Sequence, residues 1–170
     1  MKFRDLTANS IGKDLLKLKP GEEARGVFRG DPVDFRQHWA NNRSTICPGR
    51  DKCDICRAGG ETAKTSFRFR MNFVINENGA YVAKIFEQGK GTYEALRQLH
   101  QDYNLEQNQM KIRRVGSGKE TTYSILPVPN GTLTKEQEKA VAAIKLHALE
   151  VTSNDGAAAA ESDDEDDLPF

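Results

Sequence analysis

The strongest alternation of apolar and polar side chains lies between Ser66 and Ile75. A period of two is typical of a strand with one buried face. The apolar face would hold Phe67, Phe69, Met71, Phe73 and Ile75, and the opposite face Ser66, Arg68, Arg70 and Asn72. Residues 76–79 follow and end in Asn-Gly, which tolerates the positive φ angles of a tight turn. We therefore expect a hairpin whose second strand runs over 81–87.

Three further segments are predicted as short strands. Residues 23–29 alternate in character, and Gly30-Asp31-Pro32 is expected to end that strand. Residues 110–115 and 121–128 form a predicted strand pair around a glycine-rich turn. Pro127 and Pro129 are expected to end the sheet, because proline cannot donate to a strand ladder.

Helical spacing predicts three helices outside these strands. Thr92 is placed to cap one that carries Tyr93, Leu96, Leu99 and Tyr103, and Thr134 to cap one that continues to Leu149. Near the start of the chain, Ser10 is placed to cap a short basic helix that ends at Lys19-Pro20-Gly21.

Five strands with one helix between the third and the fourth is the order of an OB-fold barrel. We predict a mainly β chain in four parts: a basic N-terminal arm over 1–20, an OB-fold five-stranded barrel over 21–130 with a zinc-binding insertion at 35–60, a C-terminal helix over 131–149, and a disordered acidic tail over 150–170. The tail is expected to be disordered because it consists mostly of Ala, Asp, Glu, Ser and Gly.

All three cysteines of the chain lie close together, and a histidine precedes them. Cys53 and Cys56 form a C-x-x-C pair, Cys47 lies a short loop upstream, and His38 would complete a Cys₃His set. This is a common ligand set for one structural zinc ion, and four protein ligands leave no open position for catalysis. His100 and His147, in helix-like segments downstream, are the alternatives to His38 as the fourth ligand.

Other uses of these cysteines fit the sequence less well. A redox C-x-x-C pair is expected at a helix start after a strand of a βαβ unit, which is not predicted here. A secreted disulfide framework prefers an even number of cysteines, and the first residues are charged, unlike a signal peptide. The zinc deaminases pair Pro-Cys-x-x-Cys with His-x-Glu, and neither pattern is present.

Charge is distributed unevenly although the net charge is zero. Residues 150–170 hold eight of the 25 acidic residues and none of the 25 basic ones, so residues 1–149 carry a net charge of +8. A basic body with an acidic tail is typical of a protein that binds a polyanion, although a tail that only aids solubility would have the same composition. No apolar run approaches the roughly 20 residues of a membrane span, so no membrane partner is expected.

Single-stranded nucleic acid requires cations along its backbone and aromatic rings on which its bases stack. The alternating strand interleaves both kinds of side chain. Alternating apolar residues usually form core, so we expect Phe73 and Ile75 to be buried and only one or two of the other rings to reach nucleic acid. Trp39 would either pack on the zinc insertion or stack on a base. The candidate nucleic-acid-binding residues are Arg29, Arg36, Trp39, Arg43, Phe67, Arg68, Phe69, Arg70, Lys84, Phe86, Lys111, Arg113, Arg114 and Tyr123.

These residues and their order resemble the zinc-containing single-stranded DNA-binding proteins of T4-type bacteriophages. The resemblance covers about residues 23–130 and follows motif order more than residue identity. It runs through His38, Cys47, Cys53 and Cys56, then Lys64-Thr65-Ser66, Phe86 and Gly89-Lys90, and then 111–118 and Thr121-Thr122-Tyr123. The chain departs from that family in its shorter length and shorter zinc loop.

The end of the chain has a resemblance of its own. Asp166, Asp167, Leu168, Pro169 and Phe170 are similar to the acidic tip of bacterial single-stranded DNA-binding proteins, which docks replication and repair enzymes. Together, the resemblances imply a non-enzymatic protein that coats and protects single-stranded DNA during viral replication, recombination and repair, in the cytoplasm of an infected bacterial host. They also imply recruitment of a polymerase, helicase or primase through the tail, and self-association on DNA.

Two other classes of function remain as alternatives. An enzyme such as a nuclease would need clustered carboxylates or an open metal site, and the carboxylates concentrate in the tail. A zinc-finger regulator of duplex nucleic acid would need a recognition helix beside the zinc, and residues 57–65 are short and interrupted by glycine.

Overall fold

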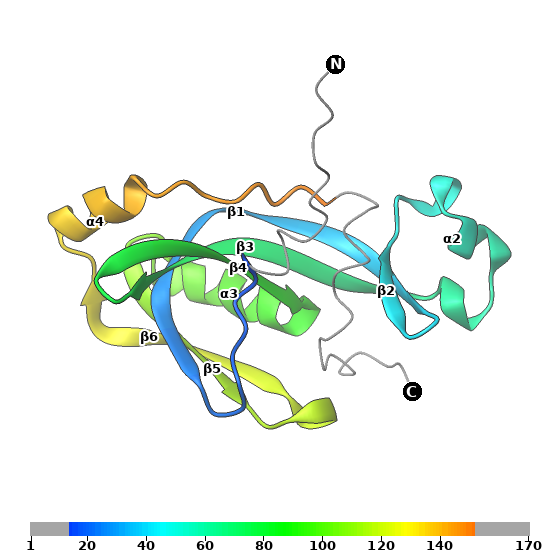
Figure 1. Cartoon of the computed structure of the whole chain (residues 1–170), viewed down its shortest axis with the longest axis horizontal. Helices are drawn as coiled ribbons and strands as arrows, with labels where there is room; N and C mark the ends of the chain where they lie inside the picture. Colours follow the sequence, from blue (N-terminus) through cyan, green and yellow to red (C-terminus); the bar gives the residue numbers. More distant parts are fainter. Residues whose placement is uncertain (1–13, 152–170) are drawn as a thin grey trace, which may run out of the picture.

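The described part of this computed structural model, residues 14–151, consists mainly of one antiparallel sheet of six strands (Figure 1). The main strands follow one another in the order β4-β3-β1-β5-β6, and the short β2 pairs with β1. Their bounds are β1 Glu23–Ala40, β2 Arg43–Ile46, β3 Thr65–Glu77, β4 Ala80–Gly89, β5 Asn108–Val115 and β6 Thr122–Thr132. No pairing joins the two ends of this path, β4 and β6, within the described residues, so the sheet is not closed.

Helices are few and occupy the connections. Helix α3, Lys90–Asp102, links β4 to β5, and helix α4, Lys135–Ala142, follows β6. The remaining helical pieces are the five-residue α2, Asp54–Ala58, and the 3₁₀ turns η1, η2 and η3, which span Arg50–Lys52, Glu61–Ala63 and Gly118–Glu120. No helix among residues 14–151 is both long and apolar enough to cross a membrane.

The first strand is longer than the sequence predicts. β1 is 18 residues long and continues through Gly30-Asp31-Pro32. Its register against β3 shifts between Arg29 and Val33. A β-bulge can absorb a proline and a glycine with positive φ without ending the strand, and Gly30 has φ +72°. The expected strand end is therefore wrong. As a result, His38 and Trp39 lie on a strand and not in an inserted loop.

The hairpin between β3 and β4 is confirmed. Asn78 and Gly79 have φ angles of 53° and 88°, and the Gly79 N–H donates to Asn76 Oδ1 at 2.9 Å. Two consecutive positive φ angles are typical of the two-residue hairpin turn that matches strand twist. The ladder then pairs Phe73 with Lys84 and Met71 with Phe86.

The inner face of the sheet forms the main core. Phe28, Phe69, Phe73 and Phe86 are at most 1 % exposed and meet in edge-on or tilted ring contacts. Leu96 of α3 and Met110 and Ile112 of β5 pack against them. Phe69 and Phe86 therefore offer no ring surface to a base, contrary to their inclusion among the candidate nucleic-acid-binding residues.

The outer face of β3 and β4 is covered by the end of the described chain. Val74 and Ala83 pack with Val141 of α4 in a second, smaller core. Residues 143–151, which we call the strap, then run extended along the sheet from α4 toward β2 (Figure 1). The Asn72 side chain accepts from the His147 N–H at 2.9 Å and donates to the His147 carbonyl at 3.1 Å. The predicted helix thus ends at Ala142, seven residues early, because the strap bonds to the sheet.

An N-terminal segment pairs with the free edge of β4 and packs against the main core. The Leu16 N–H donates to the Ile85 carbonyl at 2.8 Å, and Leu15 forms a parallel bridge to Ile85. Leu18 is buried in the main core. The short helix expected to carry these leucines is wrong for residues 15–18, because pairing with an open strand edge satisfies their backbone groups.

Two smaller boundaries also differ from expectation. Helix α3 begins at Lys90 with Gly89 as its N-cap, so Thr92 lies inside the helix and does not cap it. Strand β6 continues through Pro127 and Pro129 to Thr132. Among the described residues β6 is an edge strand, and its register against β5 shifts between Asn108 and Met110, opposite the segment that holds Pro129; edge strands and bulges are the places where a sheet tolerates proline.

Candidate metal centre and adjacent groove

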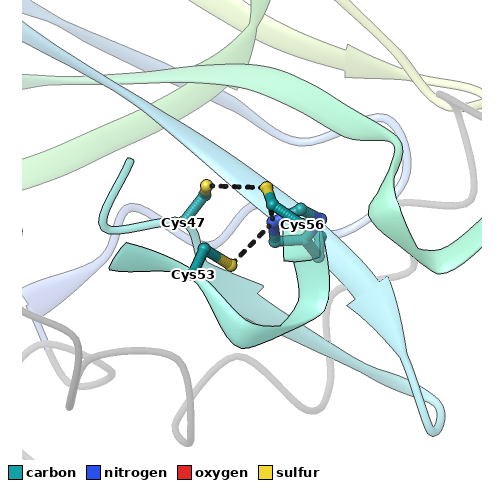
Figure 2. A group of neighbouring side chains, drawn as sticks. Cys47, Cys53 and Cys56 are labelled. Carbon is teal, nitrogen blue, oxygen red and sulfur yellow. Dashed lines mark hydrogen bonds between the residues drawn. The ribbon is translucent and has the colours of Figure 1, made fainter. Parts of the chain in front are cut away.

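His38, Cys47, Cys53 and Cys56 converge, with their donor atoms all within 4.8 Å of one another. His38 Nε2 lies 3.3 Å from Cys53 Sγ and 3.4 Å from Cys56 Sγ. Cys47 Sγ lies 3.6 Å from Cys56 Sγ (Figure 2). His100 and His147 are not part of this cluster, so the choice of His38 as the fourth member is supported.

Local structure brings the four donors together. β1 and β2 form a hairpin around Asn41 and Asn42, whose φ angles of 54° and 58° suit a tight turn. The hairpin pairs His38 with Thr45, and the Cys47 N–H donates to the Arg36 carbonyl at 2.8 Å. Cys53 directly precedes α2 and Cys56 lies within it, so one short helical turn places both sulfurs on the same side.

Backbone carbonyls orient the His38 ring. Its Nδ1 lies 3.0 Å from the Thr62 carbonyl and 3.1 Å from the Lys64 carbonyl, so Nδ1 carries the proton and donates. Nε2 then presents its lone pair to the three sulfurs. Such carbonyl partners are typical of metal-binding histidines, since they fix both the tautomer and the ring orientation.

The donor spacing fits one metal ion. A tetrahedral site with metal–sulfur bonds of about 2.3 Å and metal–nitrogen bonds of about 2.0–2.1 Å separates its sulfurs by about 3.8 Å and its sulfur–nitrogen pairs by about 3.6 Å. The separations of 3.3, 3.4 and 3.6 Å lie close to those edges. The four residues are therefore compatible with one structural metal ion.

The thiols differ in proton affinity. Burial raises the pKa of Cys53, but hydrogen bonds from the Cys56 backbone and thiol and from the Ile55 backbone outweigh it and bring the pKa down to about 7. Burial and hydrogen bonds to the Cys47 and Cys53 thiols raise the pKa of Cys56 to about 11. Close thiols cannot all ionise without a cation, so this set favours binding of one.

A groove of about 1080 Å³ lies beside this metal lobe, which we define as residues 40–64. Its walls come from the second half of β1, from the metal lobe and from the end of the strap. It includes three cations, two carboxylates and one aromatic ring. The lining residues are Val33, Asp34, Phe35, Arg36, Ile46, Cys47, Pro48, Gly49, Arg50, Cys56, Ala63, Lys64, Thr65, Glu150 and Val151.

One of the candidate nucleic-acid-binding residues lines this groove, and three others lie on β1, β2 or β3, the strands that contribute to its walls. Arg36 lines it, and its guanidinium lies 5.9 Å from the centre of the half-buried Phe67 ring. Trp39 is 47 % exposed near the tip of the β1–β2 hairpin, and Arg43 is exposed at the start of β2. These four residues remain compatible with nucleic-acid binding.

Arg68 and Arg70 do not face solvent, contrary to expectation. They are 9 % and 5 % exposed, and Glu87 of β4 forms ion pairs with both, at 3.6 and 2.6 Å. The strap bonds to Asn72 on the same face of β3, so this face is partly covered, whereas strand alternation alone predicts it to be open.

The remaining candidates lie elsewhere in the sheet. Lys111 and Arg113 lie on β5, and the half-buried Arg29 on β1 pairs with Asn72 of the neighbouring strand. Lys84 forms a 3.5 Å ion pair with Glu77. The Arg114 side chain donates to the Leu18 carbonyl and to Thr121 Oγ1, and the Tyr123 ring packs edge-on against Phe86. None of these residues lines the groove.

Sequence reasoning missed three groove residues, Phe35, Arg50 and Lys64. A signal for Phe35 was present, because Val33, Phe35, Gln37 and Trp39 alternate with charged or polar residues. The strand end expected at Gly30-Asp31-Pro32 separates this signal from the strand that precedes it. The predicted docking tip, Asp166, Asp167, Leu168, Pro169 and Phe170, lies outside the described residues, as do residues 1–13 of the predicted arm.

Comparison with protein-family models, with curated proteins and with solved structures finds no match for this chain.

Proposed function

We propose that the protein binds single-stranded DNA in the groove beside the metal lobe and along the adjoining face of β1. The observation that carries this proposal is the coincidence of three cations and a half-buried aromatic ring on one strip of the molecule, the wall of the groove. Arg36, Arg50 and Lys64 line the groove, and Phe35 forms part of its wall. This is the combination that a sequence-tolerant single-strand site requires.

The strip extends beyond the groove to Trp39. β1 pairs with β3 without interruption from Val33 to His38, so Val33, Phe35, Gln37 and Trp39 share a face. Phe35 and Trp39 are four residues apart, which corresponds to about 13 Å along a strand. The Arg70 guanidinium lies 5.0 Å from the centre of the Phe35 ring. A stacked base contributes about 1–3 kcal/mol, so two such rings would add substantially to charge-driven binding.

The metal in this proposal is one structural zinc ion. Three thiolates and one imidazole form a soft ligand set that Zn²⁺ favours, and they complete a tetrahedron. The role of the ion is to hold the metal lobe against β1 so that Arg50 and Lys64 face the groove. The closed set supports a binding protein over a metal-dependent enzyme.

The strand order supports a comparison with the OB-fold. With β2 assigned to the metal lobe, five strands remain, and α3 lies between the third and the fourth. Their order, β4-β3-β1-β5-β6, is that of a five-stranded Greek-key barrel left open between β4 and β6. OB-folds use this framework to bind oligonucleotides.

A role in viral replication, recombination and repair, in the cytoplasm of an infected bacterium, is supported by the sequence resemblance to the T4-type proteins. Recruitment of replication enzymes through Asp166–Phe170 is supported by the resemblance of the tail tip.

Regulation of duplex DNA by a zinc finger is the second candidate. It would require a helix long enough to place several side chains in a major groove. The helix at the metal site, α2, has five residues, which favours the single-strand proposal.

The deciding experiment compares binding of a mixed-sequence single strand with binding of the same sequence as a duplex. We expect preference for the single strand and quenching of the fluorescence of Trp39, the only tryptophan in the chain. Heparin, a polyanion without bases, should bind without comparable quenching. Equal affinity for both DNA forms would refute the proposal.

A charge variant tests the groove itself. Arg50→Ala should weaken binding and reduce the slope of log affinity against log salt by about 0.7, the value for one phosphate contact on a single strand. Lys139→Ala removes an exposed cation from α4 and serves as the matched control. If both variants have the same effect, the groove is not the binding path.

A further inference from the structure

The four metal donors differ in their access to solvent. His38 and Cys53 are 0 % and 4 % exposed. Cys47 and Cys56 are half-buried, and both line the open groove. Their sulfurs lie 3.6 Å apart on one side of the cluster (Figure 2). A small solute in the groove can therefore reach two of the three thiols, and these two are adjacent.

The backbone around these two thiols has little packing to hold it. The helical pieces η1, α2 and η2 contain no buried residue. Gly49, Gly59 and Gly60 have φ angles of 108°, 72° and 79° at their ends. The chain near Cys47 and Cys56 can therefore move enough for the sulfurs to approach the disulfide bond length of about 2.05 Å.

We propose that Cys47 and Cys56 are an oxidant-reactive thiol pair whose substrate is a small hydroperoxide such as hydrogen peroxide. One thiolate attacks a peroxide oxygen; the O–O bond breaks, a sulfenic acid forms and hydroxide leaves. The second thiolate attacks the sulfenyl sulfur; the S–O bond breaks, the S–S bond forms and a second hydroxide leaves. Two electrons pass from the two thiolates to the peroxide.

The modification removes two of the four donors and leaves only Cys53 and His38. The metal lobe then loses the bonds that hold it, since its helical pieces bury no side chain. The groove wall formed by Pro48, Gly49 and Arg50 belongs to this lobe. The thiol chemistry stands on the donor geometry alone, whereas an effect on DNA binding also rests on the proposed function.

The test treats the metal-loaded full chain with hydrogen peroxide, blocks remaining thiols with N-ethylmaleimide and maps the peptides by mass spectrometry. We expect the Cys47–Cys56 disulfide as the main product, with metal release to a chromogenic chelator at the same rate. A main product that involves Cys53, or metal release while all three thiols remain reduced, would overturn the proposal.

Two histidine variants supply a matched comparison. Cys47→His keeps four donors in a Cys₂His₂ set, which zinc accepts, but removes one member of the pair. Cys53→His changes a buried donor and keeps the pair. Peroxide-driven metal release should slow by more than an order of magnitude in the first variant and stay near the original rate in the second. Equal rates of metal release in the two variants would overturn the proposal. The peptide map of the unaltered chain tests it independently, since it requires neither variant to fold.

A DNA measurement separates the two proposals. The oxidised chain should bind oligo-dT more weakly than the reduced chain. If the Cys47–Cys56 disulfide forms as expected and oligo-dT affinity does not change, the thiol pair stands and the groove is not the DNA site.

Discussion

At the scale of single residues, the metal donors and the buried charged side chains are each held in place by specific partners. His38 is held by two backbone carbonyls, so its free nitrogen is aimed before any metal binds. Such preorganisation lowers the cost of assembling a closed site. Glu87 forms ion pairs with two buried arginines, so each of these charges has a counter-ion within 4 Å.

Metal affinity should rise with pH. The raised pKa of Cys56, about 11, keeps this thiol protonated in the metal-free protein at neutral pH. Binding must expel that proton, and each proton released changes apparent affinity by about tenfold per pH unit. A competition titration with a chelator at pH 6.5 and pH 8, corrected for the chelator's own protonation, measures this effect. Affinity that does not change between the two pH values would contradict it.

Glu87→Ala should destabilise the fold strongly. Arg70 Nε lies 2.6 Å from Glu87 Oε2, and the two side chains are 6 % and 13 % exposed. Loss of one partner from a buried pair costs about 3–5 kcal/mol. Glu23→Ala breaks the exposed pair with Arg25 and should cost at most about 1 kcal/mol. Urea unfolding followed by circular dichroism compares the two variants, and equal losses would show that the Glu87 pair is not effectively buried.

At the scale of elements, the strap determines which side of the sheet is open. Its attachment to β3 depends on Asn72, whose side chain is 3 % exposed and makes two hydrogen bonds to the His147 backbone. His147 Nε2 also lies 2.8 Å from the Ala83 carbonyl of β4. One residue of the strap thus bridges two neighbouring strands.

Asn72→Ala should release the strap while the sheet remains folded. It leaves a backbone N–H and a carbonyl of His147 without their partner, which costs about 1–3 kcal/mol. Hydrogen exchange should accelerate at residues 144–149 and stay slow in β3. Asn76→Ala, which removes an exposed turn bond, is the control. If exchange accelerates equally in the strap and in β3, the strap is not a separate unit.

At the scale of the whole molecule, the sheet and the metal lobe differ in what stabilises them. The sheet has a core of aromatic and aliphatic side chains on its inner face. The metal lobe lies at one end of the long β1–β3 ribbon (Figure 1). Its helical pieces contain no buried side chain, so metal coordination supplies most of its stability.

Metal removal should therefore unfold the metal lobe and leave the sheet intact. After chelation, hydrogen exchange should become fast over residues 47–63 and remain slow in β3 and β4. The unfolding midpoint of the sheet should change little. Fast hydrogen exchange throughout β3 after chelation would show that the sheet also depends on the metal, contrary to this prediction.

The acidic tail should reduce DNA affinity. The described chain ends at Val151, which lines the groove, and the following residues up to Phe170 carry seven acidic side chains and no basic one. Deletion of 152–170 should raise oligo-dT affinity at low salt. The gain should shrink at high salt, since the screening length falls to about 3 Å at 1 M. Removal of Phe170 alone, which leaves the charge of the side chains unchanged, is the control. Equal affinities of the deleted and full chains at low salt would contradict competition by the tail.

Local patterns in the sequence determined several features of the protein. The β3 alternation, the Asn-Gly turn and the C-x-x-C spacing each depend on neighbouring residues, because strand period, turn dihedrals and a helical turn act over a few positions. His38 could be predicted as a donor for the same reason, because it lies close to Cys47 in the sequence. The mainly β class followed from these patterns.

Only the tertiary structure decided which surfaces are open. Alternation predicts two faces of β3 but not that the strap, 75 residues away in the sequence at His147, bonds to Asn72 and helps to bury it. Pro32 signals a strand end locally, yet pairing with β3 on both sides of the bulge keeps β1 continuous. The groove joins residues from β1, the metal lobe and the strap. Contacts between distant segments depend on the packing of the whole chain, and this is why the position of the groove could not be derived from the sequence.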